Sequence, residues 1–105
     1  MVRNPTVYIL ASKRNGTLYV GVTSDPVKRL WEHRHGVVDG FTSKYKVHAL
    51  VYLEQYDRME EAILREKQTK KRNRAWKIRL IEESNPEWRD LYPEIVKAGF
   101  PPARE

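Results

Sequence analysis

The chain has 105 residues, no cysteine and a formal net charge of +6 at pH 7. This length predicts a single domain over residues 1–105 with one modest hydrophobic core, and the missing cysteines exclude disulfides, cysteine-based zinc sites and thiol nucleophiles. The positive charge favours a polyanionic partner, either nucleic acid or an acidic membrane surface, and the competing interpretation is a basic soluble domain without such a partner.

Two strands joined by a turn are expected at the start of the chain. The segments TVYILAS (residues 6–12) and TLYVGVT (residues 17–23) are rich in β-branched and aromatic residues, which is typical of strands. Asn15 and Gly16, which stand between them, form the strongest short signal for a β-hairpin. The two segments are therefore expected to pair with each other in antiparallel fashion.

The length of the hairpin loop decides whether two tyrosines can act together. With an even number of loop residues, Tyr8, Tyr19 and Gly21 lie on one face of the sheet. A two-residue turn would offset the two tyrosines by four residues, about 13 Å along the strands, and a four-residue loop would halve that offset. We expect the longer loop, because only that register lets both phenols serve one site.

A helix is expected to follow the hairpin. Ser24 or Asp25 can cap this helix, and Pro26 suits its first position. Arg29 and His33 stand four residues apart, so they are neighbours on one flank of the helix. The apolar stripe that would pack on the sheet consists of Val27, Leu30 and Trp31.

One further strand and two further helices complete the predicted fold. The segment HALVYLEQY (residues 48–56) is apolar enough to be a central strand. Asp57 can cap a second helix that ends near Lys71, and a third helix is expected over residues 74–84. The proline-containing tail, residues 92–105, is expected to be an irregular or partly disordered cover. The order β-β-α-β-α-α predicts an α+β fold in which helices pack on a sheet.

A carboxylate occupies an inward position of the second predicted helix. The apolar positions Met59, Ala62 and Ile63 define its buried face, and the next inward position is Glu66. The simpler interpretation is a surface ion pair with Lys70 four residues later. The inward position of Glu66 argues against that pair and favours a functional carboxylate.

Basic residues are dense where the second helix gives way to the third. They suit contacts with phosphates, and an aromatic ring among them suits stacking on a base, so nucleic-acid contact is favoured over a merely soluble surface. The expected contact residues are Lys67, Lys70, Lys71, Arg72, Arg74, Trp76 and Lys77.

The polar residues of these elements suit phosphodiester cleavage. The sequence has no P-loop, no dinucleotide-binding glycine motif and no HExxH zinc motif. Tyr8 or Tyr19 can take a proton if nearby cations lower its pKa, and Arg29 can clamp a phosphate with paired N–H donors. His33 can hydrogen-bond to the water, the phosphate or a tyrosine, and Glu66 can hold one hard divalent cation.

These motifs, taken in order, resemble the signature of the GIY-YIG nucleases. TVY at residues 6–8 and YVG at residues 19–21 match the two tyrosine motifs, and Arg29 with His33 and then REKQTKK with Glu66 follow at the expected spacing. The chain is similar to the small, stand-alone bacterial members of this family over about residues 6–91. The resemblance implies a three-stranded antiparallel sheet flanked by helices and a metal-dependent DNA endonuclease.

The resemblance also implies roles for particular residues. Its catalytic positions fall on Tyr8, Tyr19, Arg29 and His33, and its metal ligand falls on Glu66, which would hold one Mg²⁺ or Mn²⁺ ion. Its supporting positions fall on Gly21 and, as a loose match, on Asn85. Thr6 departs from the family pattern, which usually has glycine there, and strand pairing tolerates that change.

The leading expectation is an enzyme that cuts DNA, with branched or damaged DNA among its substrates and DNA repair or recombination as its setting. The alternatives are a non-catalytic nucleic-acid-binding module that keeps the fold and a protein-interaction domain whose charge is incidental. The N-terminus lacks the features of a secretory signal, and no apolar run approaches the roughly 20 residues of a membrane helix. A cytoplasmic protein without membrane contact is therefore expected, with a protein partner and the oligomeric state left open.

Overall fold

The computed structural model describes residues 4–35 and 46–97, and its centre is a three-stranded antiparallel sheet. The strands are β1 (Thr6–Ala11), β2 (Leu18–Thr23) and β3 (Ala49–Gln55), in the order β2-β1-β3. The third strand was expected to be central, and that prediction is wrong. All six residues of β1 are buried, whereas most of β3 is partly exposed, so β1 takes the central place.

The hairpin between β1 and β2 has the longer of the two loops considered. The amide of Ser12 donates to the carbonyl of Thr17 at 3.0 Å, which leaves residues 13–16 as a four-residue loop. Tyr8 stands opposite Gly21 and Leu10 opposite Tyr19. The two tyrosines are therefore offset by two residues on one face of the sheet, as predicted.

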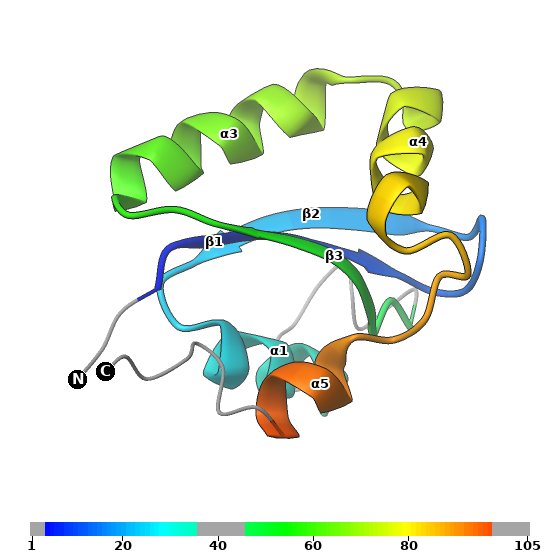
Figure 1. Ribbon diagram of the computed structural model, residues 1–105, viewed down its shortest axis with the longest axis horizontal. Coiled ribbons are helices and arrows are strands. Elements are labelled where there is room, and N and C mark those ends of the chain that lie inside the picture. The colour runs from blue at the N-terminus through cyan, green and yellow to red at the C-terminus, as the bar shows by residue number, and fades with distance from the viewer. Residues whose placement is uncertain (1–3, 36–45, 98–105) are drawn as a thin grey trace.

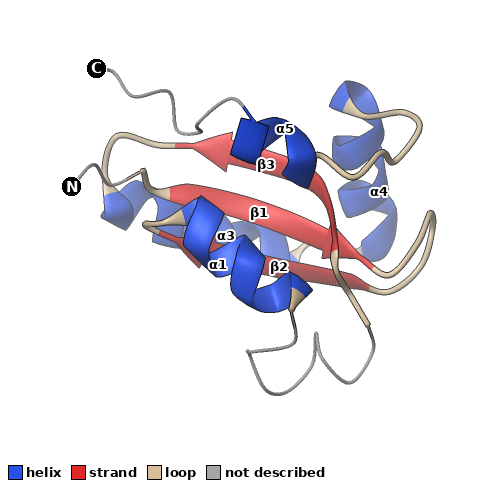
Figure 2. Ribbon diagram, turned by 90° about the horizontal axis from the view of Figure 1, so that it is seen from below, coloured by secondary structure: helices blue, strands red, loops and turns tan. Residues whose placement is uncertain are grey.

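Helices cover both faces of the sheet. Figure 1 shows α3 (Met59–Lys71) and α4 (Arg74–Ser84) on one side, and α1 (Pro26–Arg34) and α5 (Tyr92–Lys97) on the other. Seen from the α1 side, α1 lies across β2 and α5 lies beside β3 (Figure 2). Within residues 4–35 and 46–97, no helix is long and apolar enough to cross a membrane.

Alternation along the strands divides the buried side chains into two clusters. Val7, Ile9 and Ala11 of β1 face α3 and α4, where they pack with Ala62 and Ile81. Tyr8 and Leu10 face the other side, in a cluster completed by Leu30 of α1, Leu50 of β3 and Ile95 of α5. Tyr8 therefore belongs to the cluster on the α1 side, and Tyr19 packs against that cluster.

The helix starts agree with the sequence in two of three cases. Asp25 caps α1 by accepting a long hydrogen bond of 3.4 Å from the amide of Lys28. α4 begins at Arg74, as expected, because the Asn73 side chain accepts from the amide of Trp76 at 2.8 Å. The expectation for Asp57 is wrong, since the N-cap of α3 is the next residue and its side chain makes no capping bond.

The tail is more ordered than the sequence predicted. Residues 92–97 form α5, and Pro93 is compatible with a helix because it lies in the first turn. The segment before α5 is tied to β3, since the amide of Leu91 donates to the carbonyl of Leu50 at 2.7 Å. Asp90 accepts from the amides of Leu50 and Tyr92, both at 3.1 Å. The predicted irregular tail is therefore wrong for residues 92–97, and residues 98–105 lie outside the described part of the chain.

Candidate active site

Gly21 allows the Tyr8 phenol to lie across β2. A Cβ atom built on Gly21 would stand 2.5 Å from both Cζ and the hydroxyl oxygen of Tyr8, which is far inside any real contact. The two residues are directly opposite each other in the β1–β2 ladder. The group that approaches the Gly21 backbone closely is therefore the Tyr8 ring, and the supporting role of Gly21 stays a prediction.

A buried hydrogen bond joins the sheet to α1. The Tyr8 hydroxyl and Nε2 of His33 are 2.9 Å apart, and the two residues are only 1% and 2% exposed. Tyr19, which is partly buried, completes a triangle of rings, with centroids 6.4 Å from Tyr8 and 5.4 Å from His33. The register of the hairpin and the inward face of α1 thus bring three of the four predicted catalytic side chains together.

Burial sets the protonation states of this pair. Burial raises the pKa of the Tyr8 hydroxyl far above its ordinary value, the neighbouring Tyr19 raises it further, and Arg29 lowers it only in part. Burial and then the charge of Arg29 lower the pKa of His33 to about 4. At neutral pH, Tyr8 is therefore protonated and His33 is neutral, and the tautomer of His33 sets which of the two donates in their hydrogen bond. The sequence allowed Tyr8 or Tyr19 to take a proton if nearby cations lower its pKa; for Tyr8, burial outweighs the effect of Arg29.

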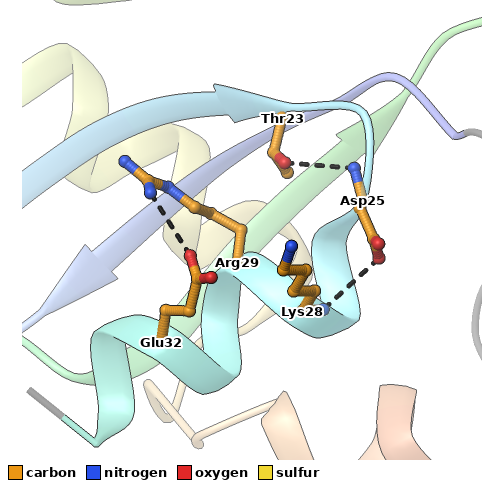
Figure 3. Close-up of a pocket in the computed structure, with 5 residues that line it drawn as sticks. All are labelled: Thr23, Asp25, Lys28, Arg29 and Glu32. Carbon is orange, nitrogen blue, oxygen red and sulfur yellow. Dashed lines mark hydrogen bonds and ion pairs between the residues drawn. The ribbon is translucent and has the colours of Figure 1, made fainter. Parts of the chain in front are cut away.

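Arg29 stands between this pair and an open cleft. Its guanidinium is close enough to Tyr8 to lower the pKa of the Tyr8 hydroxyl in part, and it pairs loosely with Glu32 at 3.4 Å. The cleft has a volume of about 200 Å³, and Figure 3 shows Lys28 and Arg29 rising from α1 toward β2. The residues that line it are Thr23, Asp25, Lys28, Arg29 and Glu32.

Sequence reasoning missed two of these lining residues. Lys28 and Glu32 lie beside Arg29 in the cleft, with the ammonium group of Lys28 directed toward β2 (Figure 3). Sequence could have pointed to them, because Lys28 stands one residue before Arg29 and Glu32 three residues after it on the same short helix. The cleft therefore carries two cations, Lys28 and Arg29, beside the two carboxylates of Asp25 and Glu32.

Glu66 comes from the opposite side of the sheet. It lies on the inward face of α3, one turn after the buried Ala62, and its side chain is 12% exposed. The negative charge of Glu66 raises the pKa of Tyr8, although burial, Tyr19 and Arg29 have larger effects on that pKa. The carboxylate therefore acts on the site electrostatically. The inward position was predicted correctly. The argument against an ion pair was wrong, because Lys70 Nζ lies 2.5 Å from a Glu66 oxygen.

The donor set around Glu66 fits a loosely held hard cation. No group of three or more potential His, Cys, Asp or Glu ligands occurs in the described part of the chain. Mg²⁺ commonly keeps several waters and binds through one or two carboxylates and substrate phosphates, so one carboxylate suffices for such a site. The pair with Lys70 would have to open for Glu66 to serve as that ligand.

The predicted nucleic-acid face is partly engaged in internal contacts. Lys67 and Lys71 are exposed on α3. The Trp76 ring is only partly exposed, and the guanidinium groups of Arg65 and Arg72 lie 5.5 Å and 5.1 Å from its centroid. Two guanidinium groups therefore already lie against the Trp76 ring, which was expected to stack on a base. This face is better suited to contacts with phosphates than to stacking on a base.

Asn85 has a structural role. Its amide nitrogen donates to the carbonyls of Val51 at 3.1 Å and Arg89 at 2.9 Å, and its oxygen accepts from the amide of Arg89 at 3.0 Å. The residue is 3% exposed. Both amide hydrogens are thus used to hold the end of α4 against β3, away from any substrate.

Comparison with known proteins shows the family of this chain. The model of the GIY-YIG catalytic domain matches residues 4–79, and GIY-YIG domains are nuclease domains that generally use divalent metal ions and act on DNA. The matched range includes Tyr8, Tyr19, Arg29, His33 and Glu66.

Several small relatives match along most of their length. A UPF0213 protein of Syntrophus aciditrophicus is 42% identical over 82 residues, which is 77% of this chain and 92% of the relative. A UPF0213 protein of Staphylococcus saprophyticus is 36% identical over 77 residues, which is 73% of this chain and 93% of the relative. The solution structure of a UPF0213 protein of Bacillus halodurans has a TM-score of 0.53 at 28% identity and covers 83% of this chain and 92% of that one. The chain therefore belongs to the GIY-YIG family and is similar to its small UPF0213 proteins.

Proposed function

We propose that this protein is a divalent-metal-dependent endonuclease that hydrolyses phosphodiester bonds in DNA. The observation that carries the proposal is the buried hydrogen bond of 2.9 Å between the Tyr8 hydroxyl and Nε2 of His33, close to Arg29 at an open cleft. A proton relay next to a phosphate-binding cation is the arrangement that hydrolysis of a phosphodiester requires.

The relay explains how a tyrosine with a raised pKa can still accept a proton. The attacking water gives its proton to the Tyr8 oxygen while the original Tyr8 proton moves to Nε2 of His33, so tyrosinate never accumulates. The water oxygen then bonds to phosphorus, the bond to the leaving oxygen breaks, and His33 holds the proton until solvent removes it. Tyr19 is the second phenol at the site, and comparing Tyr8→Phe with Tyr19→Phe decides which hydroxyl carries the proton.

Arg29 and Glu66 supply charge. The Arg29 guanidinium can turn from its loose pair with Glu32 to bind two phosphate oxygens as charge builds up on them. Glu66 would hold one Mg²⁺ or Mn²⁺ ion, which when bound polarises the phosphate or stabilises the leaving alkoxide. The basic face of α3 and α4 would contact the DNA backbone, chiefly through Lys67 and Lys71.

The proposal extends to the biological setting. We infer cytoplasmic action on branched or damaged DNA during repair or recombination, supported by the net charge of +6 and by the nuclease family. Branched, nicked and single-stranded substrates tested beside intact duplex would show which of these DNA forms is preferred. A requirement for a protein partner would appear as cutting that begins only when cell extract is added.

A nicking assay tests the enzyme directly. Supercoiled plasmid and the branched and single-stranded substrates would be incubated with Mg²⁺, Mn²⁺ or chelator and with wild type, Arg29→Ala or Glu66→Ala. The matched control is Glu60→Ala, which removes a 72%-exposed carboxylate from the same helix. Metal-dependent cutting that persists in the control and disappears in the two site variants supports the proposal. Equal cutting by wild type and Glu66→Ala contradicts it.

A second function is favoured by one observation, the ion pair that already occupies Glu66. A chain that keeps this pair would be a non-catalytic nucleic-acid-binding module. Such a module binds DNA in a salt-sensitive manner and cuts none of the substrates with any metal. The variant Lys70→Met separates the two functions, because it releases Glu66 from its ion pair. An enzyme should then cut DNA better than wild type does, whereas a binding module should still cut no DNA.

A further inference from the structure

A second cleft lies at the hairpin end of β2. Its volume is about 290 Å³, and it is lined by Thr17, Leu18, Arg74 and Lys77. Leu18 is the first residue of β2, whereas the cleft beside Arg29 adjoins Thr23, the last residue of that strand. The two clefts therefore lie at opposite ends of one edge strand, whose rise separates them by about 17 Å along β2. The helices that line them, α4 and α1, lie on opposite sides of the sheet (Figure 1).

Hydrogen bonds hold one side of the second cleft in place. Nη2 of Arg74, the first residue of α4, donates to the carbonyl oxygens of Asn15 and Gly16, both at 2.6 Å. These bonds dock α4 onto the hairpin loop. Asn15 has the left-handed φ of 58° that turns the loop toward the helix. The cation at the cleft is therefore held in place before any ligand arrives.

The charge around this cleft is not neutralised. Lys13 and Arg14 are exposed in the same hairpin loop whose Asn15 and Gly16 carbonyls accept from Arg74, and Lys77 follows Arg74 on α4. Across the described ranges, none of these four cations forms an ion pair with a carboxylate. Gathering like charges destabilises the folded chain unless an anion neutralises them, so the cluster is suited to a polyanion.

We propose that this second cleft is a phosphate-binding subsite for the DNA strand whose scissile phosphate lies at Arg29. The strand would follow the edge of β2 from one cleft to the other. A span of about 17 Å exceeds the spacing of neighbouring phosphates, so the subsite takes a phosphate several nucleotides from the scissile one on the same strand. This inference rests on the proposed nuclease function and adds a minimum substrate length to it.

Binding of hairpin duplexes with stems of four, eight and twelve base pairs tests the subsite. The measurement is fluorescence anisotropy in chelator at several salt concentrations, so that no strand is cut. Lys77→Ala and Lys13→Ala are compared with Arg89→Ala, which also removes one cation but from a 59%-exposed residue on the β3 side. Thermal unfolding of each variant confirms that its fold is intact.

The subsite predicts an effect that depends on stem length. Lys77→Ala and Lys13→Ala should bind the four-base-pair stem as wild type does, and should bind the longer stems more weakly, with the salt slope reduced by about one. Arg89→Ala should match wild type at every length. Lys77→Ala and Lys13→Ala that behave like Arg89→Ala at every length overturn the subsite, even if metal-dependent cutting is intact. A length-dependent loss without any cutting supports the subsite and refutes the nuclease.

Discussion

At the scale of single residues, Gly21 controls the position of the Tyr8 phenol. Replacement of Gly21 by alanine should force the ring aside, because the new methyl carbon would stand 2.5 Å from the hydroxyl oxygen. Overpacking of this kind costs about 1–3 kcal/mol of unfolding free energy. We expect a folded variant in which the bond to His33 is broken and cleavage is lost, measured by urea unfolding and by nicking.

The control is Val22→Ala, one residue further along β2 and directed at the opposite face. It should lose some stability through reduced packing and keep cleavage. If Gly21→Ala cuts as well as Val22→Ala does, the Tyr8 position has no part in the reaction.

His33 should make the stability of the fold depend on pH. Its pKa is about 4 in the folded chain and about 6.5 in the unfolded chain, so between these values the unfolded chain binds more protons. The contribution of His33 to the unfolding free energy is therefore fully present above pH 6.5. It is lost as the pH falls to 4, and the loss is up to about 3 kcal/mol. Urea unfolding from pH 7 to pH 4 measures the loss. His33→Gln should lose less over that range, and an unchanged slope in this variant would assign the effect to other groups.

The faces on which the candidate site residues lie could be predicted from sequence, but their chemical state could not. Spacing alone put Tyr8 and Tyr19 on one face and Glu66 on the inward side of its helix. The raised pKa of Tyr8 depends on burial by side chains distant in sequence, and the pair of Glu66 with Lys70 depends on one rotamer. The periodicity of a sequence predicts which face of a strand or helix a residue lies on. It does not predict how far tertiary packing removes that residue from water.

At the scale of the element, a polar clamp fixes α3 against β3. Glu54 accepts two hydrogen bonds from Arg65, at 3.0 Å and 2.9 Å, and further bonds from the hydroxyls of Tyr52 and Tyr56. Burial alone would raise the pKa of Glu54, but these donors outweigh it and the pKa is lowered. Because Glu66 follows Arg65 on the helix, the clamp also sets the direction in which Glu66 points.

Glu54→Gln should loosen this clamp. The amide has one acceptor oxygen where the carboxylate has two, and its NH₂ group would face the Arg65 donors. We expect a loss of about 1–3 kcal/mol in urea unfolding and weaker Mn²⁺ binding, measured by calorimetry. Glu60→Gln on the exposed side of α3 should change neither quantity. Unchanged Mn²⁺ affinity in a destabilised Glu54→Gln would show that the clamp does not position Glu66.

Elements defined by local signals were predicted better than those defined by distant contacts. The helix over residues 74–84 was predicted with its observed limits, because Asn73 caps it locally. The central place of β1 depends on pairing with two strands, one of them about forty residues away, which no local pattern contains. α5 was missed because it has only six residues, contains Pro93 and is ordered by packing against the α1-side cluster.

At the scale of the whole molecule, the site depends on a cluster that α5 helps to close. Tyr8 and Leu10 share their buried cluster with Ile95, which comes from the last described helix and is 5% exposed. The family model ends at residue 79, so this helix lies beyond the matched catalytic domain. The buried side of the site is thus completed by a segment that contributes no catalytic group.

Ile95→Ala should therefore weaken both the fold and the site. Truncating a buried isoleucine costs about 2–5 kcal/mol, and the cavity would lie in the cluster that holds the Tyr8 ring. The neighbouring Val96 is 46% exposed, so Val96→Ala is a matched control that should keep stability and cleavage. Cleavage measured well below the unfolding temperature separates a local loosening of Tyr8 from simple unfolding. Full activity in folded Ile95→Ala would show that β1 and α1 hold the relay without help from α5.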